Sequence, residues 1–200
     1  MEEGRAVFHR VLTYTLGILV NKCVTLLVLG AGLLITGHAV LTPMLQAISL
    51  MAGDFVSMAR TADRATPSRR PNAWRLRNLT LAAIPLACMK LVFCIGVLSA
   101  GAFYWRLGST QLQTLTLVML VFIGQTLVFV LRDFWNSRPS LLLMLFSVID
   151  VVVMSIFAIF GLFMQALPVR VVVALLAAAA AFGFLLDQVK LLVLRWLPID

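Results

Sequence analysis

Residues 141–163 read LLLMLFSVIDVVVMSIFAIFGLF, an apolar run in which Asp150 is the single ionisable side chain. At a rise of about 1.5 Å per residue, a helix of this length crosses a hydrocarbon core of roughly 30 Å. Runs of comparable length recur along the whole 200-residue chain. This repetition predicts an all-α membrane protein built as a bundle of transmembrane helices.

The composition supports a membrane class, because 62% of the residues are hydrophobic and 12% are charged. Soluble domains carry roughly twice that charged fraction. A signal peptide is excluded, since its short apolar core would be followed by a polar mature chain. We expect one transmembrane domain over residues 1–200 with six spans, at about 11–36, 41–58, 79–103, 112–131, 141–163 and 171–194.

The basic residues fall mainly on one side of this arrangement. Six spans place both termini on the same side, together with the connections after the second and fourth spans. That side holds Arg5, Arg10, Arg60, Arg64, Arg69, Arg70, Arg75, Arg77, Arg132, Arg138, Lys190 and Arg195, while the opposite side holds only Arg106 and Arg170. Because basic residues collect in cytoplasmic loops, we expect both termini in the cytoplasm.

The net charge of +8 comes mainly from basic residues placed on one side of the spans. This placement is explained by membrane topology and by contact with the lipid bilayer, and we expect no nucleic-acid partner. The cysteines, Cys23, Cys88 and Cys94, all lie within apolar spans and have no metal-ligand spacing. We read them as buried thiols, and we expect no metal site and no catalytic residue in the chain.

The largest polar segment is a basic loop over residues 59–78, expected in the cytoplasm. Pro67 and Pro71 exclude a continuous helix there. The side chains expected to fix topology and contact lipid head groups are Arg60, Arg64, Arg69, Arg70, Trp74, Arg75 and Arg77. Fixing the membrane topology would by itself explain why this loop is basic.

Four ionisable side chains lie well inside the spans: Lys22, Asp54, Lys90 and Asp150. Each costs a few kcal/mol or more in lipid, so such residues normally face the protein interior and mark ion pathways. Lys22 and Asp54 both lie about 20 Å from the outer ends of neighbouring spans, so they are predicted to meet. Lys90 and Asp150 form a possible second pair, for which a structural role is favoured.

Asp54 is the best candidate for an ion or proton site, with a structural partnership with Lys22 as the alternative. Gly53 precedes it, and a glycine weakens the helix at the carboxylate. Interrupted helices at mid-membrane expose backbone groups to ions in many transporters.

Several motifs resemble the P-type ATPases, in an order that covers most of the chain. Residues 53–58 read GDFVSM, Asp63 follows, and residues 67–74 read PSRRPNAW. This resembles the sixth membrane helix and the following loop of the plasma-membrane proton pumps, whose pattern is N-D-F-x-x-M, T-D and P-S-x-x-P-x-x-W. Similarity continues at residues 3–10 (EGRAVFHR) with Tyr14, at 134–140 (FWNSRPS) and at 150–152 (DVV).

The resemblance implies that the six spans correspond to helices five to ten of a cation pump, most closely a proton exporter in the plasma membrane. It implies that Asp54 is the proton acceptor and donor. Two positions depart from the family: Gly53 replaces the usual asparagine, and Val24 replaces a fifth-helix arginine, with Lys22 the nearest cation.

The phosphorylation motif D-K-T-G-T is absent from these residues, as are the nucleotide-binding and actuator segments. ATP and Mg²⁺ are thus implied only for a complete pump, and we expect a separate chain to carry those parts. The alternatives are a free-standing membrane interaction module without transport activity, and an autonomous ion-conducting bundle.

The predicted topology can be tested by cysteine-accessibility labelling with a membrane-impermeant reagent. Cysteines introduced at Thr66 and Ser137 should react only from the cytoplasmic side, and those at His38 and Gly108 only from outside. Labelling of position 66 from outside would refute the arrangement.

Overall fold

The structure is a computed structural model that describes residues 21–61, 76–131 and 141–196. In these ranges it is helical throughout, with no strand. The helices are Asn21–Thr36, α2 (Pro43–Thr61), α3 (Leu76–Ser99), the π-helical turn η1 (Ala100–Tyr104), α4 (Ser109–Leu131), α5 (Leu141–Phe160) and α6 (Val169–Trp196). The all-helical prediction is confirmed for the described parts of the chain.

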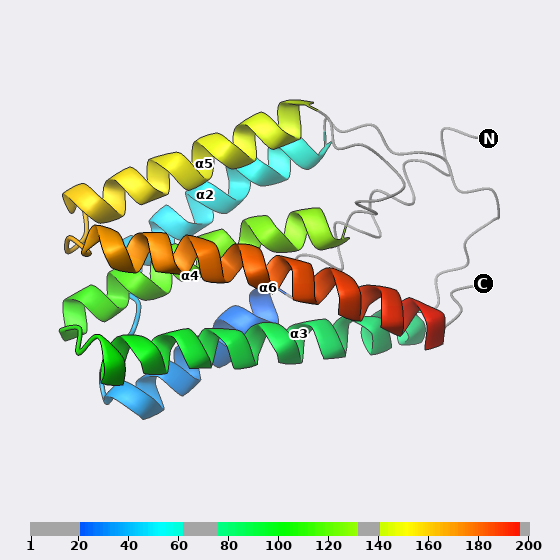
Figure 1. Cartoon of the computed structure of the whole chain (residues 1–200), viewed down its shortest axis with the longest axis horizontal. Helices are drawn as coiled ribbons and strands as arrows, with labels where there is room; N and C mark the ends of the chain where they lie inside the picture. Colours follow the sequence, from blue (N-terminus) through cyan, green and yellow to red (C-terminus); the bar gives the residue numbers. More distant parts are fainter. Residues whose placement is uncertain (1–20, 62–75, 132–140, 197–200) are drawn as a thin grey trace.

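The helices lie along one common long axis, and the three described connections meet at one end of the bundle (Figure 1). These connections are residues 37–42, 105–108 and 161–168. Gly37 and Gly161 end their helices with φ of 68° and 70°, a left-handed conformation that glycine adopts without steric cost. Because the chain reverses direction at each of these connections, the helices that a connection joins are antiparallel (Figure 1).

The α2 helix begins as its sequence dictates. The hydroxyl of Thr42 accepts a hydrogen bond from the Leu45 N–H at 3.3 Å, which is an N-cap. Pro43 occupies the first helical position, where its missing N–H costs nothing. The helix continues without interruption through Gly53, so the expected weakening of the backbone beside Asp54 produces no break.

The central element is α4, which packs against α2, α3, α5 and α6. Its segment 117–123 is buried on every face, with Leu117, Val118, Met119 and Ile123 fully inaccessible. A helix that is apolar on all sides belongs in the interior of a bundle, and α4 follows that rule.

The first turns of α4 also form hydrogen bonds to two of the connections at this end of the bundle, residues 37–42 and 161–168. Gln113 Nε2 donates to the Ala39 carbonyl at 2.8 Å, and Thr114 Oγ1 donates to the Gln165 carbonyl at 2.9 Å. Since backbone carbonyls in loops have no helical partner, these bonds satisfy groups that would otherwise be unpaired.

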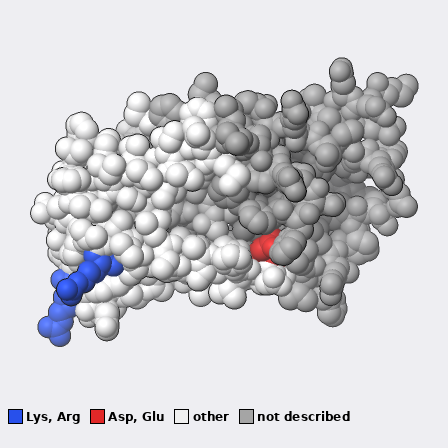
Figure 2. All heavy atoms as spheres, turned by 45° about the horizontal axis from the view of Figure 1, so that its top comes forward, with Lys and Arg blue, Asp and Glu red and all other residues white. Residues whose placement is uncertain are grey.

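Within the residues that the structure describes, two helical stretches, Ile84–Tyr104 and Val169–Val189, are long and apolar enough to cross a membrane. The outer surface is also apolar: Leu34, Phe160 and Phe184 are 88%, 74% and 77% exposed. Figure 2 shows a face whose described part is mostly uncharged, with basic groups only at one end. So extensive an apolar surface is suited to lipid contact. That all six helices span the bilayer stays a prediction.

The contact between the first helix and the loop that follows it depends on Gly32. A Cβ at this position would lie 2.6 Å from Val40 Cγ2, whereas one at Gly30 would meet nothing within 4 Å. We expect Gly32→Ala to lower the free energy of unfolding by about 1–3 kcal/mol through overpacking. The control Gly30→Ala should be neutral or stabilising by up to about 1 kcal/mol, because alanine favours the helix. Thermal unfolding in detergent measures both, and equal effects would contradict this packing.

Candidate functional site

A polar cluster lies between α4 and α5, in the interior of the bundle. Gln125 of α4 and Ser147 and Asp150 of α5 are 6%, 4% and 9% exposed. Gln125 Nε2 donates to Asp150 Oδ2, and Ser147 Oγ donates to Gln125 Oε1 at 2.9 Å. Buried polar groups persist only when hydrogen-bonded, and here each side chain has a partner.

The spacing on α5 explains why two of these residues share one face. Over residues 144–160 of α5, the buried positions are Ser147, Asp150, Met154 and Ala158, at intervals of three, four and four residues. This interval is that of one face of an α-helix. Asp150 stands ten residues before the end of α5 at Phe160, about 15 Å along the axis.

A second polar contact joins the first helix to α3. Lys90 is fully buried, and its ammonium group donates to Asn21 Oδ1. Lys90 stands in the buried stripe of α3 with Leu86, Cys94 and Leu98, spaced every four residues. Asn21 shares the inward face of its helix with Val24, which is fully buried.

The expected pairing of Lys90 with Asp150 does not appear in the structure. Each of the two side chains hydrogen-bonds to a carboxamide on another helix. The helix that carries Lys90 packs against α4, α6 and η1, whereas α5 packs against α2, α4 and α6. The two residues therefore occupy different interfaces of the bundle.

Lys22 is exposed on the outer surface of the first helix. Its neighbour Asn21 takes the inward position instead, because successive residues of a helix differ by about 100°. Asp54 lies within α2, but its side chain is outside the described residues, so its meeting with Lys22 stays a prediction.

The basic loop is also beyond what the structure describes. Arg64, Arg69, Arg70, Trp74 and Arg75 fall in the undescribed range 62–75. Arg60 lies in α2 and Arg77 in α3, and their side chains are not described either. The lipid-binding role of these residues stays a prediction.

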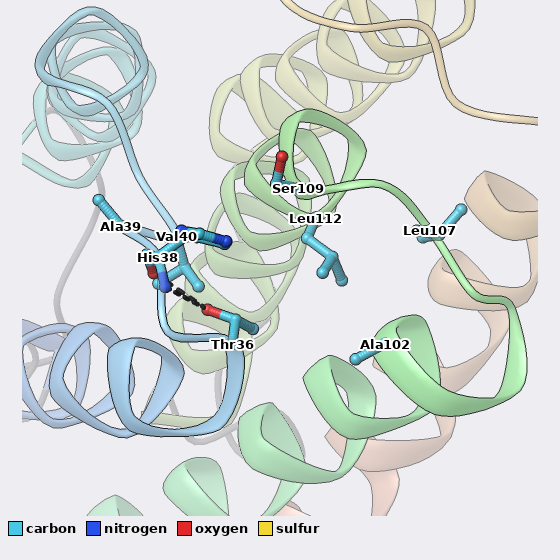
Figure 3. Close-up of a pocket in the computed structure, with 8 residues that line it drawn as sticks. All are labelled: Thr36, His38, Ala39, Val40, Ala102, Leu107, Ser109 and Leu112. Atoms are coloured by element: carbon cyan, nitrogen blue, oxygen red, sulfur yellow. Dashed lines mark hydrogen bonds between the residues drawn. The ribbon is translucent and has the colours of Figure 1, made fainter.

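A pocket of about 390 Å³ opens at the end of the bundle where the connections meet (Figure 3). Thr36 helps to shape it, because its hydroxyl donates to the His38 carbonyl at 3.0 Å. The lining residues are Thr36, His38, Ala39, Val40, Ala102, Leu107, Ser109 and Leu112. None of them belongs to either polar cluster, so the pocket is separate from the candidate site.

The sequence reasoning missed Asn21, Gln125 and Ser147, because it examined only ionisable side chains inside the spans. The signal was helical spacing: Asn21 stands three residues before Val24 and seven before Val28. Such polar residues, in register with an apolar stripe, are placed to hydrogen-bond inside a membrane bundle.

No group of three or more His, Cys, Asp and Glu side chains in the described ranges could hold a metal ion. The polar groups of the two clusters are amides, a hydroxyl, an ammonium and a single carboxylate. This set is suited to holding or moving a proton, or to contacting one monovalent cation, rather than to a tightly held divalent metal.

The chain matches no known protein-family model. It is similar to a protein of Methanocaldococcus jannaschii named "Putative cation-transporting ATPase", at 21% identity over 204 residues. The match covers all of this chain and 25% of that protein, so the chain spans about a quarter of the relative's length. Together with the two long apolar helices, this similarity indicates a membrane protein that resembles part of a cation-transporting ATPase.

Lys90 is buried and Lys22 is exposed, so the same substitution at both positions provides a matched test of the site. Lys90→Met removes the buried donor to Asn21, and we expect it to lower the free energy of unfolding by about 1–3 kcal/mol. Lys22→Met makes the same chemical change at an exposed position and should stay within about 0.5 kcal/mol of the parent. Denaturation in detergent measures both, and equal losses would refute the assignment of Lys90 as the interior cation.

Proposed function

We propose that this chain is the membrane-embedded, ion-conducting part of an ATP-driven cation pump of the P-type class, and that the transported cation is the proton. The observation that carries the proposal is the Gln125–Asp150–Ser147 cluster, which is buried between two helices of an apolar bundle. Ionisable groups are expensive inside a membrane and commonly mark ion pathways.

The arrangement of the helices supports a role for Asp54 in the same pathway. The α2 helix, which carries Asp54, packs against both α4 and α5, the helices that provide the polar cluster. A carboxylate on α2 would therefore belong to the group of helices that holds Asp150. In our proposal Asp54 is the proton carrier.

The similarity to a cation-transporting ATPase supports the pump class, since it runs along the whole chain. Residues 53–58 and 67–74 supply the resemblance to proton pumps. In this proposal the phosphorylation and nucleotide-binding domains, with ATP and Mg²⁺, act outside the 200 residues. The membrane is proposed to be the plasma membrane, with both termini cytoplasmic.

The proposal is tested by isolating the chain, with an affinity tag, from its native membrane. We expect it to purify with the phosphorylation and nucleotide-binding domains, and to show vanadate-sensitive ATPase activity with ATP-dependent acidification in proteoliposomes. Asp54→Asn should reduce acidification to background, because an amide does not titrate. Asp187→Asn is the matched control on α6, where the side chain is half-buried, and should retain transport.

The other outcomes would identify other functions. Absence of any associated ATPase domain would refute the pump and favour a membrane interaction module, whose basic loop would bind anionic lipid. Proton or cation flux without ATP would favour an autonomous conducting bundle. Full transport by the Asp54→Asn protein would remove Asp54 from the pathway.

A further inference from the structure

The Gln125 carboxamide stands between two different oxygen groups of α5. Its Nε2–H group donates to Asp150, and its Oε1 accepts from the Ser147 hydroxyl at 2.9 Å. In this state Asp150 acts purely as an acceptor, as an ionised carboxylate does. Among the described side chains, Gln125 is the hydrogen-bond partner of Asp150, and its amide orients the carboxylate.

We propose that Asp150 is a proton-binding group in the interior of the bundle, and that the Gln125 amide reverses its hydrogen bonds when Asp150 takes up a proton. The step adds one proton, delivered by water, to a carboxylate oxygen, and no other covalent bond changes. A half-turn of the amide then exchanges its oxygen and its NH₂ group. The new carboxyl O–H donates to Gln125 Oε1, and Nε2–H donates to Ser147 Oγ.

In both protonation states, each of the three side chains keeps at least one hydrogen bond within the cluster. Ser147 makes this possible, because a hydroxyl donates in the first state and accepts in the second. A buried donor or acceptor without a partner costs about 1–3 kcal/mol. An exchange between the two states therefore needs a group, such as the Ser147 hydroxyl, that can both donate and accept. Ser147 stands three positions before Asp150 on the same face of α5.

The charged groups of the elements that pack against α5 are few. The α4 helix has no ionisable side chain between Ser109 and Leu131. Asp54 and Arg60 belong to α2, and Arg170, Asp187, Lys190 and Arg195 to α6. Of these six, only the side chains of Arg170 and Asp187 are described, and neither bonds to Asp150.

A nearby fixed cation would hold Asp150 in its ionised form, whereas a neutral amide accommodates both forms. The inference concerns proton binding alone. It stands whether or not the chain belongs to a pump, and it assigns Asp150 a function that is independent of Asp54.

The test is infrared difference spectroscopy of the protein in lipid nanodiscs, recorded between high and low pH. We expect the carbonyl band of a protonated carboxyl group to appear at low pH, and the glutamine side-chain amide bands to shift in the same step. Asp150→Asn, which keeps hydrogen-bonding capacity at that position, should lose both signals. Asp54→Asn should leave this pair of signals in place.

Two serine variants on α5 separate the exchange from general perturbation. Ser147→Ala should keep the carboxyl band but diminish the amide shift, because the NH₂ group loses its acceptor. Ser155→Ala is the matched control and should match the parent, since the hydrogen bond of Ser155 within the described residues is to the Val151 carbonyl of its own helix. The proposal is overturned if no carboxyl band appears, if the band survives in Asp150→Asn, or if both serine variants give the same spectrum.

Discussion

The structure depends on one constraint, which is that polar groups inside an apolar bundle must find their hydrogen-bond partners within the chain. The α4 helix meets this constraint in two ways. At the loop end, Gln113 and Thr114 bond to carbonyls of two different connections. Deeper inside, Gln125 orients the carboxylate of α5. Among the described side chains, the Oε1 atom of Gln46 is the buried exception without a partner.

The buried lysine and the buried aspartate that the structure describes are each bonded to a carboxamide. Asn21 accepts from Lys90, and Gln125 donates to Asp150. An amide carries a donor and an acceptor on one planar group, so it serves a cation and an anion equally well. Because an amide is neutral, it does not neutralise a charge on the side chain to which it bonds. In the described ranges, the amide bonds of Lys90 and Asp150 therefore lie at two different helix interfaces.

The helices were predictable because runs of apolar residues define their length, and turn residues define where they end. Gly37 and Pro43 bound the first connection as their backbone preferences require. The candidate site was predictable only in part. Depth along a span follows from residue number, but rotation about the helix axis and the choice of neighbouring helix do not. Lys22 and Asn21 have nearly equal depth, yet only Asn21 faces inward.

The hydrogen bonds of α4 to the connections at the loop end bear on where the bundle can change shape. Gln113 joins α4 to the connection before α2, and Thr114 joins it to the connection between α5 and α6. We therefore expect any relative motion of α2, α4 and α5 to be smaller at that end than at the opposite end. Asp150 lies about 15 Å along the axis from the end of α5. A tilt of α2 or α5 about the fixed end would alter the surroundings of the carboxylate while the loops keep their bonds. In the proposed pump, this is the geometry by which a force applied at the far end reaches the proton-binding groups.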